Sequence, residues 1–363
     1  MWSNYPEIAQ EIDETEKVIY KNIKSRNRLL TKICSGLNAA GGKRIRPALA
    51  VIASRFGSFD AAEVRKLAGA IEILHMATLI HDDVIDRSET RRGKITVSAG
   101  YGPDMAIYTG DFLFTRAVAM LASLKIAEAA ATDAAADSHK LPDMAAEAVK
   151  LICEGEVDQY LQRFDINISA RAYLKRIYRK TAVLFSAACA MGAVSAGCEK
   201  SLVKILGRYG FYYGMAFQMR DDLNDFISDE EAEGKPVIKD ITEGVYTLPL
   251  IYTMSGSSEL RRFISGAVRA EKRGAGRIRE DDAAKIVKIV KDNGGIAYTL
   301  KMIDRYVDKG LHIIKTLPWN PGLPLLAELL YSLGSSPGKT KQFVKNDGYK
   351  AYENSDENAG KCS

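Results

Sequence analysis

Residues 79–94 have the sequence LIHDDVIDRSETRRGK, and this stretch indicates both a fold and a chemistry. Asp82 and Asp86 are four residues apart, so a helix projects both carboxylates from one face, with Asp83 beside them. The preceding residues are apolar or small, namely Ile71, Leu74, Ala77 and Thr78. The stretch therefore predicts the acidic end of a buried helix.

A second acidic segment, FQMRDDLNDF at residues 217–226, repeats the arrangement with Asp221, Asp222 and Asp225. Clustered carboxylates repel one another unless cations neutralise them. A small number of oxygen ligands suits Mg²⁺, which keeps several waters and bridges to substrate phosphates. A solvated charged face is the simpler explanation of one such motif. Two copies, each ending an apolar helix, favour a magnesium site that holds a diphosphate.

Basic residues complement the acidic motifs. The run GGKRIRP, residues 41–47, places Lys43 and Arg46 just before a helix that its proline can open. Helix N-termini and arginine side chains both suit phosphate oxygens. Arg91 and Arg92 follow the first acidic motif closely. Each pair alone is equally well explained by a basic loop, but beside the acidic motifs both favour phosphate binding.

Four polar residues lie near these motifs. His75 precedes Asp82 by seven residues, or two helical turns, so it faces the same side. Lys180 and Thr181 begin a stretch of small residues, and Gln218 lies one turn before the second acidic motif. Taken singly, each has an ordinary explanation as a polar core or helix-end residue.

Apolar residues recur at helical spacing through most of the chain, and no strand-like alternation persists. The sequence therefore predicts an all-α protein with one helical domain over residues 1–334. A polar tail is expected over 335–363, and a loop over 132–140. The predicted helices are 5–35, 47–57, 61–86, 104–126, 141–163, 171–196, 200–228, 245–255, 279–293, 295–316 and 321–333.

The composition narrows the class of protein. The net charge of +5 suits small anionic substrates, and no basic stripe with interleaved aromatics suggests nucleic acid. The five cysteines never form a CxxC pair, which argues against a disulfide framework or zinc site and for a reducing compartment. The uncharged stretch 182–198 is too weakly apolar for a membrane span, and the N-terminus does not look like a signal peptide. A cytoplasmic location is expected.

Five segments in order along the chain resemble the trans-type polyprenyl diphosphate synthases. They are GGKRIRP, EILHMATLIHDDVIDRSETRRGK, RKTAVLFSAACAMGA, FQMRDDLNDF and EGKPVIKDITEGVYTLP. HMATLIHDDVID and AIYTGDFLFTRA are similar in particular to the catalytic large component of bacterial heptaprenyl diphosphate synthase, as is the run from RFD to YLKRIYRKTA. The resemblance implies a single antiparallel helix bundle around a deep central cavity, with aspartates from two helices facing across its mouth.

The resemblance also implies roles for individual residues. Asp82 and Asp86 would bind magnesium with support from Asp83, and Asp221 would bind a further ion. Asp222 and Asp225 would complete that second cluster. The diphosphate of isopentenyl diphosphate would be held by Lys43, Arg46, His75 and Arg92. The allylic diphosphate would be held by Arg91, Lys180, Lys235 and Lys239. Thr181 and Gln218 would line the path of the allylic cation with oxygen dipoles.

The implied reaction joins isopentenyl diphosphate to an allylic diphosphate such as farnesyl diphosphate, with several Mg²⁺ ions per site. It needs no side-chain nucleophile.

Ala77 lies about 7.5 Å before Asp82 along the helix. Short-chain relatives carry an aromatic residue near this level, so Ala77 and Thr78 imply an open path and a medium or long product. Heptaprenyl diphosphate for a menaquinone side chain is the expected product.

Partners follow from the same resemblance. A dimer is expected, either a homodimer or a heterodimer with a small non-catalytic synthase component. Only peripheral membrane contact is expected, when the product is released.

Two residues depart from the family pattern, which often has Gly where Ile238 stands and Lys where Val245 stands. Both lie in the segment expected to close over the substrate.

Several alternatives remain at this point. A geranylgeranyl, hexaprenyl or octaprenyl diphosphate synthase belongs to the same family. An HD-type metal phosphohydrolase would use the pair His81-Asp82, but it needs a further upstream histidine as a ligand, where His75 is the only one, and leaves the second acidic motif unexplained. A terpene cyclase shares the first motif but usually carries Asn, Ser and Glu at the second. A non-catalytic binding subunit tends to lose one motif, and both are intact here.

Overall fold

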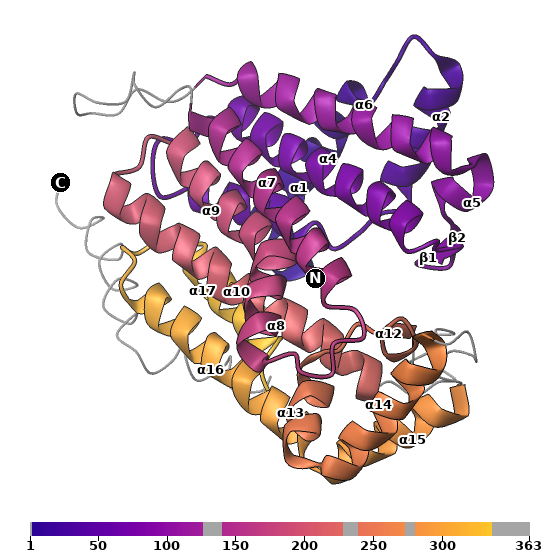
Figure 1. The fold of residues 1–363 in the computed structure, drawn as a ribbon. Helices are drawn as coiled ribbons and strands as arrows, with labels where there is room; N and C mark the ends of the chain where they lie inside the picture. The colour runs from indigo at the N-terminus through magenta and orange to yellow at the C-terminus, as the bar shows by residue number, and fades with distance from the viewer. Residues whose placement is uncertain (1, 126–139, 228–238, 273–279, 336–363) are drawn as a thin grey trace, which may run out of the picture. The chain divides into compact units, whose positions relative to one another are not determined.

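The computed structural model describes residues 2–125, 140–227, 239–272 and 280–335 of the 363 (Figure 1). Two strands, β1 Thr90–Arg91 and β2 Lys94–Ile95, pair in a small hairpin, and the other regular elements of these residues are helices. The all-α class predicted from the sequence is therefore confirmed. In chain order, the helices are η1 Trp2–Asn4, α1 Pro6–Asn22, α2 Arg28–Ala39, α3 Ile45–Ser54, α4 Ala61–Ile85, α5 Val97–Tyr101, α6 Pro103–Ala122, α7 Lys140–Leu161, α8 Ala170–Ile177, the π-helical turn η3 Tyr178–Ala182, α9 Val183–Ser195, α10 Lys200–Ile227, α12 Lys239–Thr242, α13 Leu248–Gly256, α14 Ser258–Lys272, α15 Glu280–Asp292, α16 Gly295–Lys315 and α17 Leu323–Tyr331.

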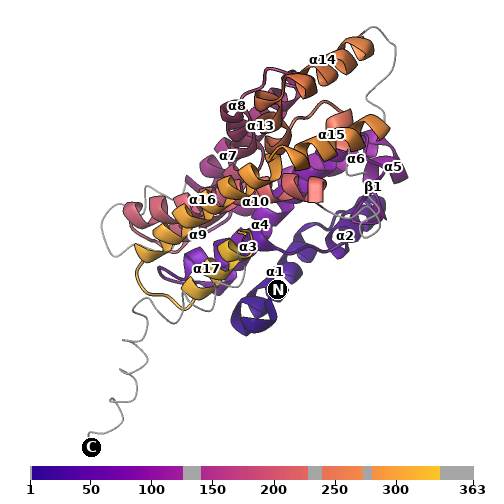
Figure 2. The ribbon, with the colours of Figure 1, turned by 90° about the horizontal axis from the view of Figure 1, so that it is seen from below.

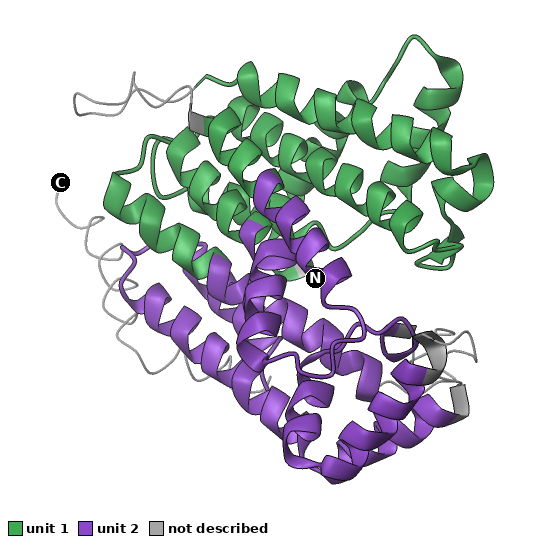
Figure 3. Ribbon diagram, in the orientation of Figure 1, with its two compact units in different colours: residues 1–149, 184–210 green, residues 150–183, 211–363 purple. Residues whose placement is uncertain are grey.

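The chain forms two compact units (Figure 3). Unit 1 comprises Met1–Val149 and Leu184–Gly210, and unit 2 comprises Lys150–Val183 and Phe211–Ser363. The predicted single domain over residues 1–334 stays a prediction. The predicted tail beyond residue 335 and most of the predicted loop over 132–140 lie outside the described residues.

Unit 1 is built around α4, which packs against α1, α3 and α6. Figures 1 and 2 both show α4 within this group of helices. Buried apolar residues lie on most sides of α4, as expected for a helix enclosed by others. The side chain of Asp60 starts the helix by accepting hydrogen bonds from the backbone N–H groups of Ala62 and Glu63. The enclosed helix carries the first acidic motif at its C-terminal end.

Helix α9 also belongs to the core of unit 1. Its residues Ala188, Cys189 and Ala193 are buried, as expected for a tightly packed core helix. It approaches α3 so closely that a Cβ atom on Gly192 would lie 2.3 Å from the carbonyl oxygen of Ala50. Glycine is therefore required at this contact, because a neighbouring backbone cannot move aside as a side chain can.

In unit 2, α13 packs against α8, α14, α15 and α16. The rings of Tyr252 on α13 and Tyr298 on α16 stack with centroids 4.1 Å apart. Gly295, at the start of α16, lies against Pro249 and Thr253 of α13. These contacts fix the C-terminal helices of unit 2 around α13.

The structure corrects two of the predicted helices. The predicted helix 5–35 is wrong, because the chain leaves the helix after Asn22 and restarts at Arg28. Asn27 caps the second helix by accepting from the N–H groups of Leu29 and Leu30. The predicted helix 171–196 is interrupted by the π-helical turn η3.

Other elements were absent from the prediction, namely α14, the hairpin and the short helices η1, α5 and α12. Helix α14 carries Leu260, Ile264 and Val268 at four-residue spacing on its buried side, so its pattern was present in the sequence.

Helix α6 is long and apolar enough to cross a membrane by length and hydropathy. Only 39% of its most apolar window is buried. It packs along α4, however, and begins with Pro103 at its first turn. The core contacts explain the apolar character of the side that faces α4.

Candidate active site

The first acidic motif ends α4 in unit 1. Asp82 and Asp86 are partly exposed, and the N–H of Asp86 donates to the carbonyl oxygen of Asp82 at 2.8 Å. Asp83 is buried, and its carboxylate accepts a hydrogen bond from Nε of Arg91 at 2.8 Å. The outer two aspartates are therefore partly open to solvent, and the middle one holds the hairpin that follows.

The hairpin β1–β2 connects this motif to the basic run 41–47. Arg92 and Gly93 form its two-residue turn with positive φ angles of 52° and 72°, as in a type I′ turn. Nη1 of Arg92 donates to the carbonyl oxygen of Gly41. A Cβ atom on Gly42 would lie 2.9 Å from the same nitrogen. The turn thus brings Arg92 to the loop that carries Lys43.

Arg46 and His75 are in direct contact beside this loop. Nη1 of Arg46 lies 3.0 Å from Nε2 of His75, and the guanidinium lies over the ring of Phe185 at 4.1 Å. A guanidinium can only donate, so Nε2 of His75 accepts and the imidazole is neutral. Burial, with the charges of Arg46 and Arg92 next, holds the pKa of His75 well below its usual range. Unit 1 therefore brings together Arg46, His75 and Arg92, three of the residues predicted to bind isopentenyl diphosphate.

Arg44 holds the loop in place, a role that the sequence did not reveal. Its backbone is left-handed, with φ of 48°, a conformation that costs about 1–2 kcal/mol for a residue with a side chain. Its buried guanidinium pairs with Glu72 at 2.6 Å and with Glu16, and it donates to the carbonyl oxygen of Asn38. These bonds fix the backbone between Lys43 and Arg46.

The N-terminus adds a further contact to this loop. Nε1 of Trp2 donates to the carbonyl oxygen of Lys43 at 3.0 Å. Lys43 itself is exposed, so its ammonium group is accessible to an anion. The short helix η1 therefore braces the backbone of a predicted phosphate ligand.

The second acidic motif lies on α10 in unit 2. Asp221 and Asp225 are exposed, whereas Asp222 is buried. Oδ1 of Asp222 accepts from Nε2 of Gln218 at 2.7 Å, and Oδ2 accepts from the hydroxyl of Tyr173 at 2.6 Å. Burial, with the charge of Asp221, raises the pKa of Asp222, while both hydrogen bonds oppose this rise. The middle aspartate is again the buried, hydrogen-bonded one.

Thr181 and Lys180 come from the π-helical turn η3. The hydroxyl of Thr181 donates to Oε1 of Gln218 at 2.6 Å. Lys180 pairs with Glu156 of α7 at 2.9 Å. A Cβ atom on Gly155 would lie 2.9 Å from the backbone nitrogen of Lys180, so α7 approaches this turn closely. Single π-helical turns occur frequently at functional sites, since the extra residue redirects the side chains that follow.

The segment after the second motif is described only in part. Lys235 and Ile238 lie outside the described residues, and Lys239 begins α12. Burial, followed by the charges of Asp222 and Glu243, raises the pKa of Asp240 to about 7. The roles predicted for the two lysines stay predictions.

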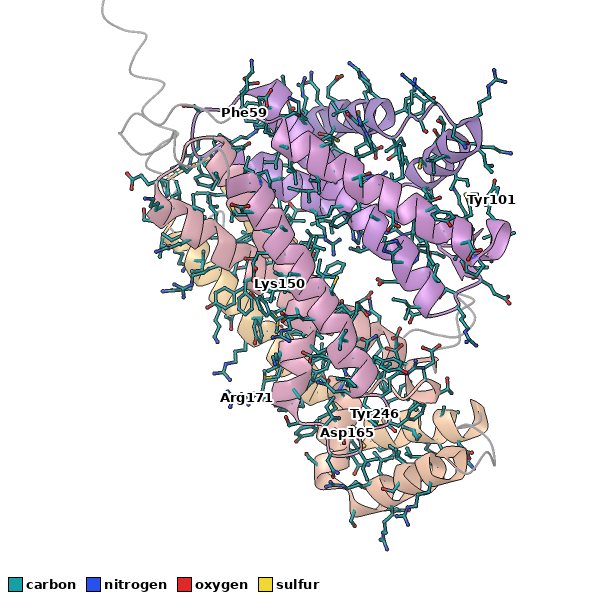
Figure 4. All side chains as sticks on the ribbon, turned by 45° about the horizontal axis from the view of Figure 1, so that its top comes forward. Phe59, Tyr101, Lys150, Asp165, Arg171 and Tyr246 are labelled. Carbon is teal, nitrogen blue, oxygen red and sulfur yellow. The ribbon has the colours of Figure 1, made fainter. Side chains whose placement is uncertain are left out.

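The following stretch is anchored within unit 2. The N–H of Phe164 donates to the carbonyl oxygen of Gly244 at 2.9 Å, and Nη2 of Arg176 donates to that of Tyr246 at 2.7 Å. Figure 4 labels Tyr246 and Asp165, which belong to these neighbouring segments. Val245 lies between Gly244 and Tyr246, whose carbonyl oxygens both accept these hydrogen bonds. It is uncharged, where the family often has Lys.

The predicted chain-length residues lie on α4. Ala77 is 1% exposed, and the hydroxyl of Thr78 donates to the carbonyl oxygen of His75 at 2.8 Å. One turn later, the ring of His81 occupies the space where a Cβ atom on Gly110 of α6 would stand. Ala77 is therefore a small buried residue on the helix that carries the first acidic motif.

The donors of both acidic motifs fit magnesium. No three His, Cys, Asp or Glu side chains converge on one point within the part of the chain that the structure describes. Each motif instead offers two exposed or partly exposed carboxylates one helical turn apart. Mg²⁺ typically takes one or two carboxylates and completes its shell with waters and phosphate oxygens. That the two motifs serve one pocket stays a prediction, because they lie in different units.

Comparison with known proteins identifies the class to which this all-helical chain with paired acidic motifs belongs. The family model described as polyprenyl synthetase matches residues 27–286. The heptaprenyl diphosphate synthase component 2 of Geobacillus stearothermophilus is 34% identical over 330 residues, 91% of this chain and 97% of that protein. The octaprenyl diphosphate synthase of Escherichia coli (strain K12) is 35% identical over 86% of this chain and 92% of that protein.

A solved structure agrees with these relatives. The polyprenyl synthase of Caulobacter crescentus CB15, complexed with calcium and isoprenyl diphosphate, matches with a TM-score of 0.78. It is 33% identical, and the match covers 89% of this chain and 93% of that one. The chain therefore belongs to the polyprenyl synthetase family, as its motifs predicted.

Proposed function

We propose that this protein condenses isopentenyl diphosphate with an allylic diphosphate such as farnesyl diphosphate, and that the reaction requires Mg²⁺. Its membership of the polyprenyl synthetase family makes it a prenyltransferase. We further propose heptaprenyl diphosphate as the product, for a menaquinone side chain. The matched relatives include heptaprenyl and octaprenyl synthases, so the product length rests on the residues beside the growing chain.

Unit 1 supplies the cations for isopentenyl diphosphate. Lys43, Arg46 and Arg92 bind its diphosphate, and His75 orients Arg46 by accepting its hydrogen bond. The position of Arg46 is further fixed by the ring of Phe185. Arginine donors placed in advance bind a diphosphate without the cost of ordering long side chains afterwards.

The acidic motifs act on the allylic diphosphate. Asp82, Asp86 and Asp221 would hold Mg²⁺ there, with Asp225 nearby. Bound Mg²⁺ would supply positive charge to the departing diphosphate. Arg91 and Lys180 add charge to the same group, as Lys235 and Lys239 are proposed to do.

The bond changes need no covalent enzyme intermediate. The allylic carbon–oxygen bond breaks, and its electron pair leaves with diphosphate. The double bond of isopentenyl diphosphate then attacks the allylic cation, and the new product loses a proton to the departed pyrophosphate. Thr181 and Gln218 stabilise the cation through their oxygen atoms, since fixed dipoles cost no reorganisation during the reaction.

Ala77 and Thr78 set how far the product grows. We expect Ala77→Phe to shorten the product, because a ring at this level would block the growing chain. Chromatography of the products of both proteins would test this, and an unchanged length distribution would refute the assignment.

A partner subunit is the last part of the proposal. Two of the matched relatives carry the name component 2. We propose that this chain also works with a small non-catalytic component as a dimer, in the cytoplasm, with peripheral membrane contact at product release. Full activity and normal product length from the purified chain alone would contradict the need for a second component.

The observation that carries the function is the paired arrangement of accessible aspartates in both acidic motifs. The test incubates the protein with Mg²⁺, farnesyl diphosphate and labelled isopentenyl diphosphate. We expect label to enter an extractable polyprenyl diphosphate with the wild type. Asp82→Asn and Asp221→Asn should lose at least a hundredfold in rate, whereas Asp13→Asn, the same change at an exposed position of α1, should not. Equal rates for all three variants would contradict the proposal.

A further inference from the structure

A chain of hydrogen bonds links four residues in unit 2. The hydroxyl of Thr181 donates to Oε1 of Gln218, and Nε2 of Gln218 donates to Oδ1 of Asp222. The hydroxyl of Tyr173 donates to the remaining oxygen of Asp222 at 2.6 Å. Tyr173, Asp222 and Thr181 are all buried, with exposed fractions of 0%, 7% and 7%.

The direction of each bond follows from the anion at the end of the chain. A carboxylate can only accept, so the amide nitrogen of Gln218 has to face Asp222. The amide oxygen of Gln218 then faces Thr181, whose hydroxyl proton points toward it. The lone pairs of the Thr181 oxygen consequently point away from Gln218. Such linked bonds polarise one another in a medium of low dielectric constant.

We propose that Tyr173 is a positioning residue, which fixes Asp222 and through it the orientation of the Gln218 and Thr181 oxygens. In this arrangement Asp222 is an anchor for these dipoles and not a ligand of Mg²⁺. The inference rests on the proposed function, in which Thr181 and Gln218 stabilise the allylic cation. Tyr173 is then the residue that keeps the oxygen atoms of Thr181 and Gln218 in the required orientation.

The engagement of Asp222 supports this assignment. Both of its carboxylate oxygens are occupied by donors of the protein. Its neighbours Asp221 and Asp225 are exposed, whereas Asp222 is buried. Asp83, the middle aspartate of the first motif, is likewise buried and bonded to Arg91. The middle position of each motif thus serves the protein itself.

The Tyr173 ring is held independently of its hydroxyl. Arg176, one turn later on α8, lies over the ring at 5.6 Å and is tied to the carbonyl oxygen of Tyr246. Phenylalanine at position 173 would keep the ring packing and lose only the hydrogen bond. The substitution Tyr173→Phe therefore isolates the proposed role.

The kinetic test compares Tyr173→Phe with Tyr252→Phe, the same change at a 39% exposed position of unit 2. We expect Tyr173→Phe to lower kcat at least tenfold, while both KM values and the Mg²⁺ concentration for half-maximal rate change less than twofold. Tyr252→Phe should leave all four quantities unchanged. An unaltered kcat in a folded Tyr173→Phe protein would overturn the inference.

A binding test separates the anchor from a metal ligand without measuring turnover. Mg²⁺ together with pyrophosphate should raise the melting temperature of the wild type. We expect Asp222→Asn to keep this rise and Asp221→Asn to lose it. Loss of the rise in Asp222→Asn as well would make Asp222 a metal ligand and overturn the inference. If the wild type transferred no prenyl group at all, the proposed function would fail instead, and the two failures are therefore distinguishable.

Discussion

The contact between Arg46 and His75 predicts how the stability of the protein depends on pH. His75 accepts a hydrogen bond from Arg46, and burial followed by neighbouring arginine charges lowers its pKa well below 6.5. In the unfolded chain the same imidazole titrates near 6.5. Below that pH, the unfolded state binds a proton that the folded state does not. The free energy of unfolding must therefore fall as the pH falls.

The size of this effect follows from linkage. An imidazole that stays neutral in the folded protein removes at most about 1.4 kcal/mol of stability per pH unit below 6.5. Between pH 7.5 and pH 5.5 the loss from His75 amounts to about 1.4 kcal/mol in total. His75→Gln keeps an oxygen that can accept from Arg46 but has no proton to take up. The variant should lose correspondingly less stability over this range.

Urea denaturation at pH 7.5, 6.5 and 5.5 would measure the difference. We expect the free energy of unfolding of the wild type to fall by about 1.4 kcal/mol more than that of His75→Gln between pH 7.5 and pH 5.5. His312→Gln, the same change at an exposed position of α16, controls for the substitution itself. Parallel pH dependences for wild type and His75→Gln would refute the assignment of a neutral imidazole.

Two further predictions concern single contacts, and a third concerns the metal. Gly192→Ala should lower the free energy of unfolding by about 1–3 kcal/mol, since its Cβ atom meets the backbone oxygen of Ala50. Gly36→Ala, with open space around it, should gain up to about 1 kcal/mol, and equal urea midpoints for the two variants would contradict this reasoning. Trp2→Phe removes one donor to the backbone of Lys43, so KM for isopentenyl diphosphate should rise about threefold at unchanged kcat. An unchanged KM in steady-state kinetics would exclude a role of Trp2 in positioning Lys43. Chelation by EDTA should abolish prenyl transfer and added Mg²⁺ should restore it, whereas activity that survives chelation would exclude the metal.

The acidic motifs and their helices could be predicted because both depend on local pattern. The apolar period that buries α4 stops where Asp82 begins, so the predicted end of the helix agrees with the observed end within one residue. The N-terminal break could have been predicted in the same way. Ser25 and Asn27 precede the second helix, and Asn is a favoured N-cap residue.

The contacts that organise the site could not be predicted in this way. Tyr173 and Asp222 are 49 residues apart, and a tyrosine on an amphipathic helix has the same local pattern whatever its hydroxyl contacts. The left-handed backbone of Arg44 is compensated by ion pairs to distant residues, which a local reading cannot see. The turn Arg92-Gly93 lacks the Asn or Asp that usually announces a type I′ hairpin.

Above all, we propose that Asp82 and Asp221 act on the same diphosphate. Calorimetric titration of the protein with pyrophosphate at saturating Mg²⁺ tests it most directly, with Asp13→Asn as the control. We expect the magnesium-dependent affinity for pyrophosphate to be at least tenfold weaker in Asp82→Asn and in Asp221→Asn alike. Wild-type affinity in either of these variants would mean that the two motifs serve different ligands, which would contradict the proposed site.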